Sequence, residues 1–227
     1  MKSHRSPSVS SSLSSGFCPL ISDLRLPSSV LCLLVLAGCN VIPPPQADST
    51  RYFALASPAL DTAAALPALG TLRLGLKAVD VAPYLKKGEL VVRRGENELV
   101  YNDYARWAEP LEASIARAVR ARLLADAKTG RVFAYPFPFD QERDFDVAIG
   151  IVRCEGVQLG GGGAAARFVA TLEITSAGAS SEVVVRKTIA MPDVVWDGKD
   201  YAALARALSN DVAALGQEVA AALPEKK

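Results

Sequence analysis

Histidine is almost absent from this chain, which has a single histidine, His4, among its 227 residues. Cysteine is also scarce, at four residues, and neither charge dominates, because 25 Lys and Arg oppose 24 Asp and Glu. A balanced charge gives no electrostatic footprint for nucleic acid and only weak attraction to anionic lipid. The scarcity of histidine argues against Ser-His-Asp triads, Cys-His pairs and His-ligated metal sites. We therefore expect no cofactor and no metal, and a protein that is not an enzyme.

The apolar run at residues 30–37 is too short to cross a bilayer, which needs about 20 apolar residues. Its length is typical of the hydrophobic region of a secretory signal. The run ends in Leu36-Ala37-Gly38-Cys39, which resembles the bacterial lipobox. In a lipobox the cysteine sulfur receives a diacylglycerol, the leader is removed, and the new amino terminus is usually acylated as well. We expect residues 1–38 to be a lipoprotein signal peptide and Cys39 to be lipidated.

Removal of this leader would leave a chain with no histidine, because His4 lies within it. Cys154 would be the one cysteine without a lipid, so no disulfide is expected within the chain. Residues 39–50 include three consecutive prolines and predict an extended tether. Asn40 follows the lipidated cysteine in place of the aspartate that retains lipoproteins in the inner membrane. It therefore favours the outer membrane, on its periplasmic face.

The remaining sequence, residues 51–227, predicts one α+β domain. Alternating apolar residues and turn signals indicate strands at 51–55, 71–79, 89–94, 98–101, 131–135, 145–159, 167–174 and 181–190. We expect the last three of these strands to form a meander. The order of strands and helices predicts a mixed or antiparallel sheet with two main helices packed on one face.

Two apolar stripes predict the helices. The second helix is expected at about residues 201–223, with Asp200 as its cap and Pro224 as its stop. The first is expected to begin near residues 107–109, with Asn102 or Asp103 as its cap. Its stripe consists of residues at intervals of four, namely Trp107, Leu111, Ile115, Val119 and Leu123.

A few groups could carry chemistry. Four carboxylates, Asp140, Glu142, Asp144 and Asp146, crowd one stretch and could serve hydrolysis or hold a hard cation. We interpret them as a solvated loop and strand edge, and a hydrolase that works without histidine stays an alternative. The run Gly160–Gly163 leads into a strand and not into a helix, so it predicts a hairpin loop and not a phosphate cradle.

The stretch from Tyr84 to Leu111 resembles the auxiliary lipoprotein family of ABC-type transporters, typified by the lipoprotein of the paraquat-inducible system. The resemblance rests on Tyr84-Leu85, a strand ending in Arg93, an Asn-x-Leu-x-Tyr strand at residues 97–101, and Arg-Trp-Ala-Glu-Pro-Leu at residues 106–111. The last segment is the most specific. Its motif residues are Tyr101, Arg106, Trp107 and Pro110.

The resemblance implies a periplasmic lipoprotein that partners MCE-domain proteins and ABC transporter components, which move lipids between the two membranes. We also expect self-association as a homo-oligomer. Exposed Tyr and Arg are favoured interface anchors, and the candidate partner-binding residues are Tyr84, Leu85, Arg93, Arg94 and Asn97. An outer-membrane assembly or secretion lipoprotein of similar build is the alternative.

Overall fold

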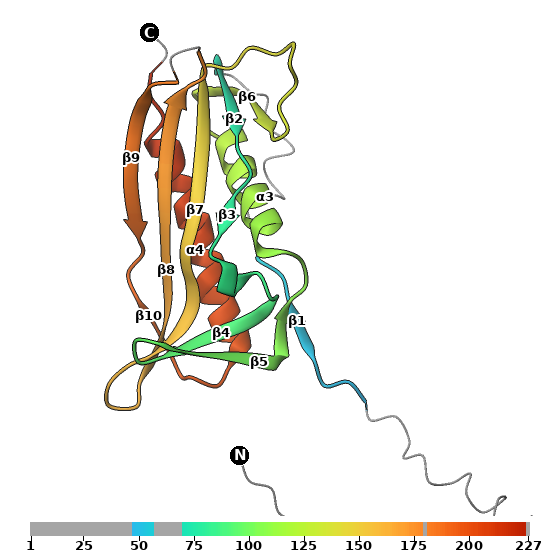
Figure 1. Cartoon of the computed structure of the whole chain (residues 1–227), viewed down its shortest axis with the longest axis vertical. Coiled ribbons are helices and arrows are strands. Elements are labelled where there is room, and N and C mark those ends of the chain that lie inside the picture. The colour runs from blue at the N-terminus through green and yellow to red at the C-terminus, as the bar shows by residue number, and fades with distance from the viewer. Residues whose placement is uncertain (1–46, 57–69, 179–180, 226–227) are drawn as a thin grey trace, which may run out of the picture. The chain divides into compact units, whose positions relative to one another are not determined.

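The structure is a computed structural model that describes residues 47–56, 70–178 and 181–225. The chain divides into two units, residues 1–48 and 49–227. The described residues do not include the predicted leader, Cys39 or Asn40, and of the predicted tether they include only residues 47–50. The second unit is a single α+β domain with one mixed sheet and two helices (Figure 1). The predicted fold class is confirmed.

Two long strands form the centre of the sheet. β7 (Phe145–Gln158) and β8 (Ala164–Ser176) pair antiparallel along nearly their whole length. β9 (Val183–Ala190) and the short β10 (Val194–Trp196) pair with the other edge of β8, so the predicted meander is confirmed. The glycine run forms the β7–β8 hairpin loop, as expected, and Leu159 N donates to Gly163 O at 2.7 Å.

The other edge of β7 is paired by three short strands in succession. β2 (Leu72–Leu76) pairs at residues 145–147, β3 (Asp80–Val81) at 150–151 and β4 (Glu89–Arg94) at 156–158, all parallel to β7. Beyond them, β6 (Thr129–Ala134) pairs with β2, and β5 (Glu98–Trp107) pairs with β4. β1 (Arg51–Phe53) adds a parallel strand to β5. A short 3-10 helix, η2 (Pro83–Leu85), joins β3 to β4.

Both helices, α3 (Leu111–Leu124) and α4 (Tyr201–Ala221), lie on the same side of the sheet (Figure 1). Alternate residues of the central strands face them and are buried, as the two-residue side-chain period of a strand requires. The two helices approach closely at Gly216 of α4 and Arg122 of α3. A Cβ at Gly216 would lie only 3.0 Å from Arg122 Cβ, so a side chain at this position would crowd α3. The largest fully buried side chains include Leu74, Ile115, Leu123, Phe168, Leu172, Ile174, Leu204, Leu208 and Leu215.

Helix α4 begins where the sequence predicts, since the Asp200 side chain accepts a hydrogen bond from Ala202 N at 2.9 Å. Trp196 is 5% exposed, and its Nε1 donates to the backbone oxygen of Asp200 at 2.7 Å. The end of β10 and the start of α4 are therefore joined through one turn. Neither described helix is long and apolar enough to span a membrane.

The predicted start of the first helix is wrong. β5 runs to Trp107, so Asn102 and Asp103 are strand residues and not helix caps, and α3 begins at Leu111. The backbone explains this, because Trp107 N donates to Gly88 O at 2.7 Å and Ala108 N to Phe53 O at 2.7 Å. Pro110 has an extended backbone, with ψ of 130°, and precedes the first helical residue. Trp107 is nevertheless buried, at 8% exposure, as its apolar spacing predicts.

Candidate partner-binding surface

The β4–β5 hairpin carries most of the predicted partner-binding residues, and an ion pair fastens it to β7. The Arg93 guanidinium donates two hydrogen bonds to the Glu155 carboxylate, at 2.7 and 3.2 Å. Glu155 has no exposed surface, although its side chain is ionisable. Arg153 Nη1 lies 3.7 Å from the same carboxylate. Arg93 therefore compensates a buried charge, which is a structural role.

Tyr84 belongs to the same network. Its hydroxyl donates to Val152 O at 3.2 Å, and the Arg93 guanidinium lies 5.5 Å from its ring centroid. Burial raises the pKa of the Tyr84 hydroxyl well above its usual range, and the neighbouring Glu155 carboxylate raises it further. The side chain is half-buried and stays neutral, so it positions the η2 turn against β7.

The five predicted partner-binding residues divide by exposure. Leu85 is 3% exposed and the Arg93 side chain 15%, so neither is free to anchor a partner. Arg94 and Asn97 are exposed, and Arg94 Nη1 lies 3.7 Å from Glu98 Oε1. The hairpin tip around Gly95 thus keeps two of the predicted contact residues on its surface.

A cavity of about 380 Å³ lies between this tip and the β7–β8 hairpin. Three arginines, Arg93, Arg153 and Arg167, line it, and each has a carboxylate nearby. Arg167 bonds Asp193, with Nε to Oδ1 at 3.0 Å and Nη2 to Oδ2 at 2.5 Å. Because these carboxylates offset much of the positive charge, the cavity is polar but not strongly basic.

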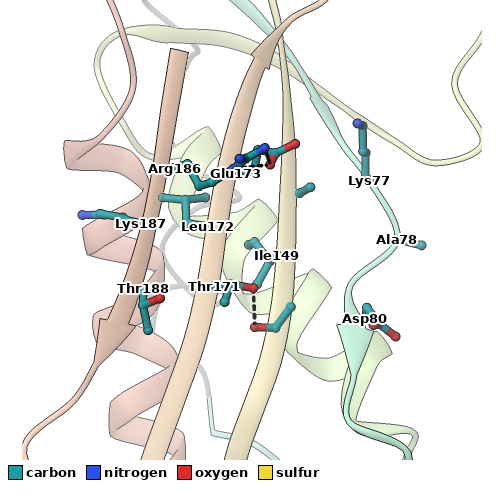
Figure 2. Close-up of a pocket in the computed structure, with 12 residues that line it drawn as sticks. Lys77, Ala78, Asp80, Ile149, Thr171, Leu172, Glu173, Arg186, Lys187 and Thr188 are labelled. Atoms are coloured by element: carbon teal, nitrogen blue, oxygen red, sulfur yellow. Dashed lines mark hydrogen bonds and ion pairs between the residues drawn. The ribbon is translucent and has the colours of Figure 1, made fainter. Parts of the chain in front are cut away.

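A cavity of about 630 Å³ lies on the sheet face opposite the helices (Figure 2). Its floor has small residues, where Thr171 Oγ1 donates to Gly150 O at 3.4 Å. Arg186 and Glu173 form an ion pair at 2.7 Å on one side, and Lys77 and Asp80 lie on the other (Figure 2). The lining contains no cysteine or histidine, and serine is also absent from it.

The four predicted carboxylates do not converge on a reaction centre. Arg73 Nη2 lies 3.2 Å from Glu142, and Arg73 N donates to Asp144 at 2.7 Å. Arg143 binds Asp146 at 2.7 Å, and Asp140 is exposed. Within the described residues no group of three or more Asp, Glu, His or Cys could hold a metal ion. The arrangement agrees with a solvated loop and strand edge.

Cys154 is a core residue, with 2% exposure. Burial raises the pKa of its thiol far above the usual range, and the Asp211 and Glu155 carboxylates add to this effect. The neutral thiol is a poor nucleophile.

The motif residues of the family resemblance hold the start of α3 and the β4–β5 pair together. Arg106 Nη1 lies 2.9 Å from Glu89 Oε1, and its Nη2 donates to Lys87 O at 3.1 Å. Tyr101 lies under the Lys87 ammonium, which is 4.2 Å from its ring centroid. Trp107 is buried at the end of β5, and Pro110 occupies the N-cap position of α3. Their roles here are structural.

Two aromatic side chains outside the hairpin tip are also exposed. Tyr135 is 64% exposed and Phe139 fully exposed, in the loop between β6 and β7. The sequence alone allows the aromatic side chains of residues 135–139 to lie either in the core or at an interface. The exposure of Tyr135 and Phe139 shows that these two side chains are not in the core. The signal was present in the two prolines, Pro136 and Pro138, which end the strand and hold the aromatic residues outside it.

Comparison with known proteins gives a family and a fold. A family model described as ABC-type transport auxiliary lipoprotein component matches residues 53–220. The crystal structure of protein XCC0632 from Xanthomonas campestris, of family DUF330, is similar, with TM-score 0.62 and 19% identity over 75% of this chain and 93% of that chain. A second crystal structure, of an uncharacterized protein, has TM-score 0.55 and 16% identity over 76% and 97% of the two chains. A search of curated proteins gives no match.

Proposed function

Because this chain belongs to the family of ABC-type transport auxiliary lipoprotein components, we propose that it is a lipid-anchored subunit of an intermembrane lipid transport system. It acts by docking to the other subunits and not by catalysis. The observation that carries the proposal is the family match over residues 53–220, joined to the lipobox that ends at Cys39.

The proposed anchor is the lipid on Cys39, at the periplasmic face of the outer membrane. Asn40 supports that sorting, since it is not the aspartate that retains lipoproteins in the inner membrane. Residues 39–50 join the lipid to β1, and as extended polyproline-like chain they would span on the order of 35 Å.

Docking is favoured over catalysis by the side chains that the structure describes. The Cys154 thiol is buried and neutral. Three residues of the acidic stretch, Glu142, Asp144 and Asp146, form ion pairs with Arg73 or Arg143. We propose that the partners are an MCE-domain protein and the ABC transporter components, and that the chain self-associates. The exposed Arg94 and Asn97 of the hairpin tip are proposed contact residues.

Two measurements on cells that produce the full chain test this function. Mass spectrometry of the mature amino terminus should find a diacylglyceryl group on Cys39, and Cys39→Ala should remove the protein from the membrane fraction. The wild-type protein, solubilised in mild detergent, should then co-purify the MCE-domain protein or the ABC transporter components. An unmodified terminus at another residue refutes the anchor. Co-purification of a β-barrel or secretion subunit in their place favours the assembly or secretion alternative.

A further inference from the structure

The loop between β6 and β7 presents a preorganised aromatic surface, Tyr135, Phe137 and Phe139, called here the aromatic loop. Tyr135 and Phe137 pack edge to face, with ring centroids 5.7 Å apart. The Arg143 guanidinium lies 4.1 Å from the Phe137 ring centroid, and Asp146 holds that guanidinium at 2.7 Å. Pro136 and Pro138 restrict the backbone between the rings. The loop therefore loses little conformational freedom when it binds.

Phe139 is the exception within this set, because it forms no ring contact among the described residues. The residue is fully exposed, whereas Phe133 in β6 is 7% exposed and Phe168 in β8 is buried completely. A fully exposed Phe side chain gains no stabilisation from the hydrophobic effect, whereas its burial would be favourable. An apolar pocket on another molecule would provide this burial, which is how aromatic hot spots act.

The charges beside Phe139 indicate what kind of molecule provides this pocket. Asp140 follows Phe139 directly, and the Glu142 side chain is 84% exposed, although Arg73 Nη2 lies 3.2 Å from its carboxylate. The Asp140 carboxylate, and to a smaller extent the paired Glu142, would be repelled by an anionic lipid surface. They suit a protein pocket with Lys or Arg at its rim, where opposite potentials guide encounter and fix the register.

The position of the loop also favours a protein over the anchoring membrane. The loop leads into β7 at Phe145, whereas the β4–β5 hairpin pairs with β7 at its other end, near Gln158. β1, which continues from the tether, pairs with that hairpin through β5. A strand of this length spans on the order of 40 Å, so the aromatic loop lies far from the attachment point of the tether (Figure 1).

We propose that the aromatic loop is a second docking site, separate from the hairpin tip, which inserts Phe139 into an apolar pocket with a basic rim on another protein subunit of the transport system. The inference rests on the proposed function for the identity of that partner. A single subunit could then contact one component through the hairpin tip and another through the opposite end of β7.

The test places a photo-crosslinking phenylalanine analogue at position 139 of the full-length chain in cells, with Tyr104 as the control position. Tyr104 is 63% exposed, close to the exposure of Tyr135, but lies in β5 at the tether end of the domain. The expected result is an adduct between position 139 and a transporter component, identified by mass spectrometry, and none from position 104. An adduct to phospholipid or to a second copy of this chain overturns the proposal.

A third position separates this inference from the proposed function. If the analogue at Asn97 captures a transporter component and the analogue at position 139 does not, the aromatic loop is no docking site although the function stands. If neither position captures one from lipidated protein, both fail. As a second readout, Phe139→Ala should reduce co-purification of the captured component by roughly tenfold or more, whereas Tyr104→Ala should leave it unchanged. Equal recovery with both variants also overturns the proposal.

Discussion

The guanidinium of Arg93 and the carboxylate of Glu155 meet through two hydrogen bonds although the residues lie 62 positions apart in the chain. The pair joins the parallel strands β4 and β7 at a point where Glu155 has no contact with solvent. A buried charge of this kind is costly unless its partner stays in place.

Replacement of Arg93 should therefore destabilise the domain. We expect Arg93→Ala to lower the free energy of unfolding by about 3 kcal/mol, the lower part of the range for a broken buried pair, because Arg153 remains 3.7 Å from the carboxylate. Urea unfolding followed by circular dichroism measures the change. The neighbouring Arg94→Ala, at an exposed site, is the control and should shift stability by less than about 0.5 kcal/mol. Equal losses in both variants would contradict a structural role for the pair.

Asp211 predicts a pH dependence. It lies in α4 at 7% exposure, and its Oδ2 has no hydrogen-bond partner among the described residues. Burial raises its pKa to about 6, with a smaller contribution from Asp193, whereas an unfolded Asp titrates near 3.9. Between roughly pH 4 and 6 the folded state then binds more protons than the unfolded state, so the Asp211 contribution to stability falls as the pH rises through this window.

The Asp211→Asn variant should isolate this effect, since the amide stays neutral at every pH. We expect the variant to exceed wild type in stability by about 1–3 kcal/mol at pH 7.5, and the difference to vanish near pH 4. Urea unfolding of both proteins across this range gives the curve. A difference that is constant with pH would show that Asp211 does not titrate in the window.

Trp107 should matter for stability and not for exposed contacts. Its ring is buried at the end of β5, beneath the start of α3, and loss of a core aromatic costs about 3–5 kcal/mol. Trp107→Ala is expected to lower the melting temperature sharply in a calorimetric scan. Tyr104→Ala, three residues earlier and exposed, should melt as wild type does. An unchanged melting curve for Trp107→Ala would refute its assignment to the core.

The cap of α4 predicts a smaller loss. Asp200 accepts a hydrogen bond from Ala202 N, and Asp200→Ala should cost about 1 kcal/mol, since the backbone contact with Trp196 remains. Lys199→Ala changes an exposed neighbour and should cost nothing measurable. The two melting temperatures, compared side by side, decide the point, and equal values would argue against the cap.

Apolar periodicity is enough to predict much of this fold. The β7–β8–β9 meander follows from alternation and turn residues, and α4 follows from its stripe and from Asp200 as its cap. Trp107 shows where periodicity fails. Trp107 is the last residue of a strand and Leu111 is the first residue of a helix, and both side chains are buried in the same core. Because the two residues are four positions apart, their spacing resembles that of a single helix.

The candidate surface was harder to predict, because exposure depends on partners far along the chain. Nothing near Arg93 in sequence reveals that Glu155 binds it, and nothing near Leu85 shows that its side chain is buried. Strands β3 and β10 were not predicted for another reason: each has only two or three residues, too few to show an alternation of apolar and polar side chains. Local patterns thus predict elements well, whereas the tertiary pairing of parallel strands decides which side chains stay free.

The parallel pairing of β2, β3 and β4 with β7 also determines the order in which the domain can form. Leu74 of β2 pairs with Phe145, and Val92 of β4 pairs with Gly156. These early strands can pair with β6 and β5, but they lack their β7 neighbour until much of the chain is available. Contacts of such long sequence separation make folding slow, because the loop must close before any pairing rewards it. The sheet is therefore completed only after β7 has been synthesised, and until then the amino-terminal strands β2 and β4 have one of their two edges unpaired.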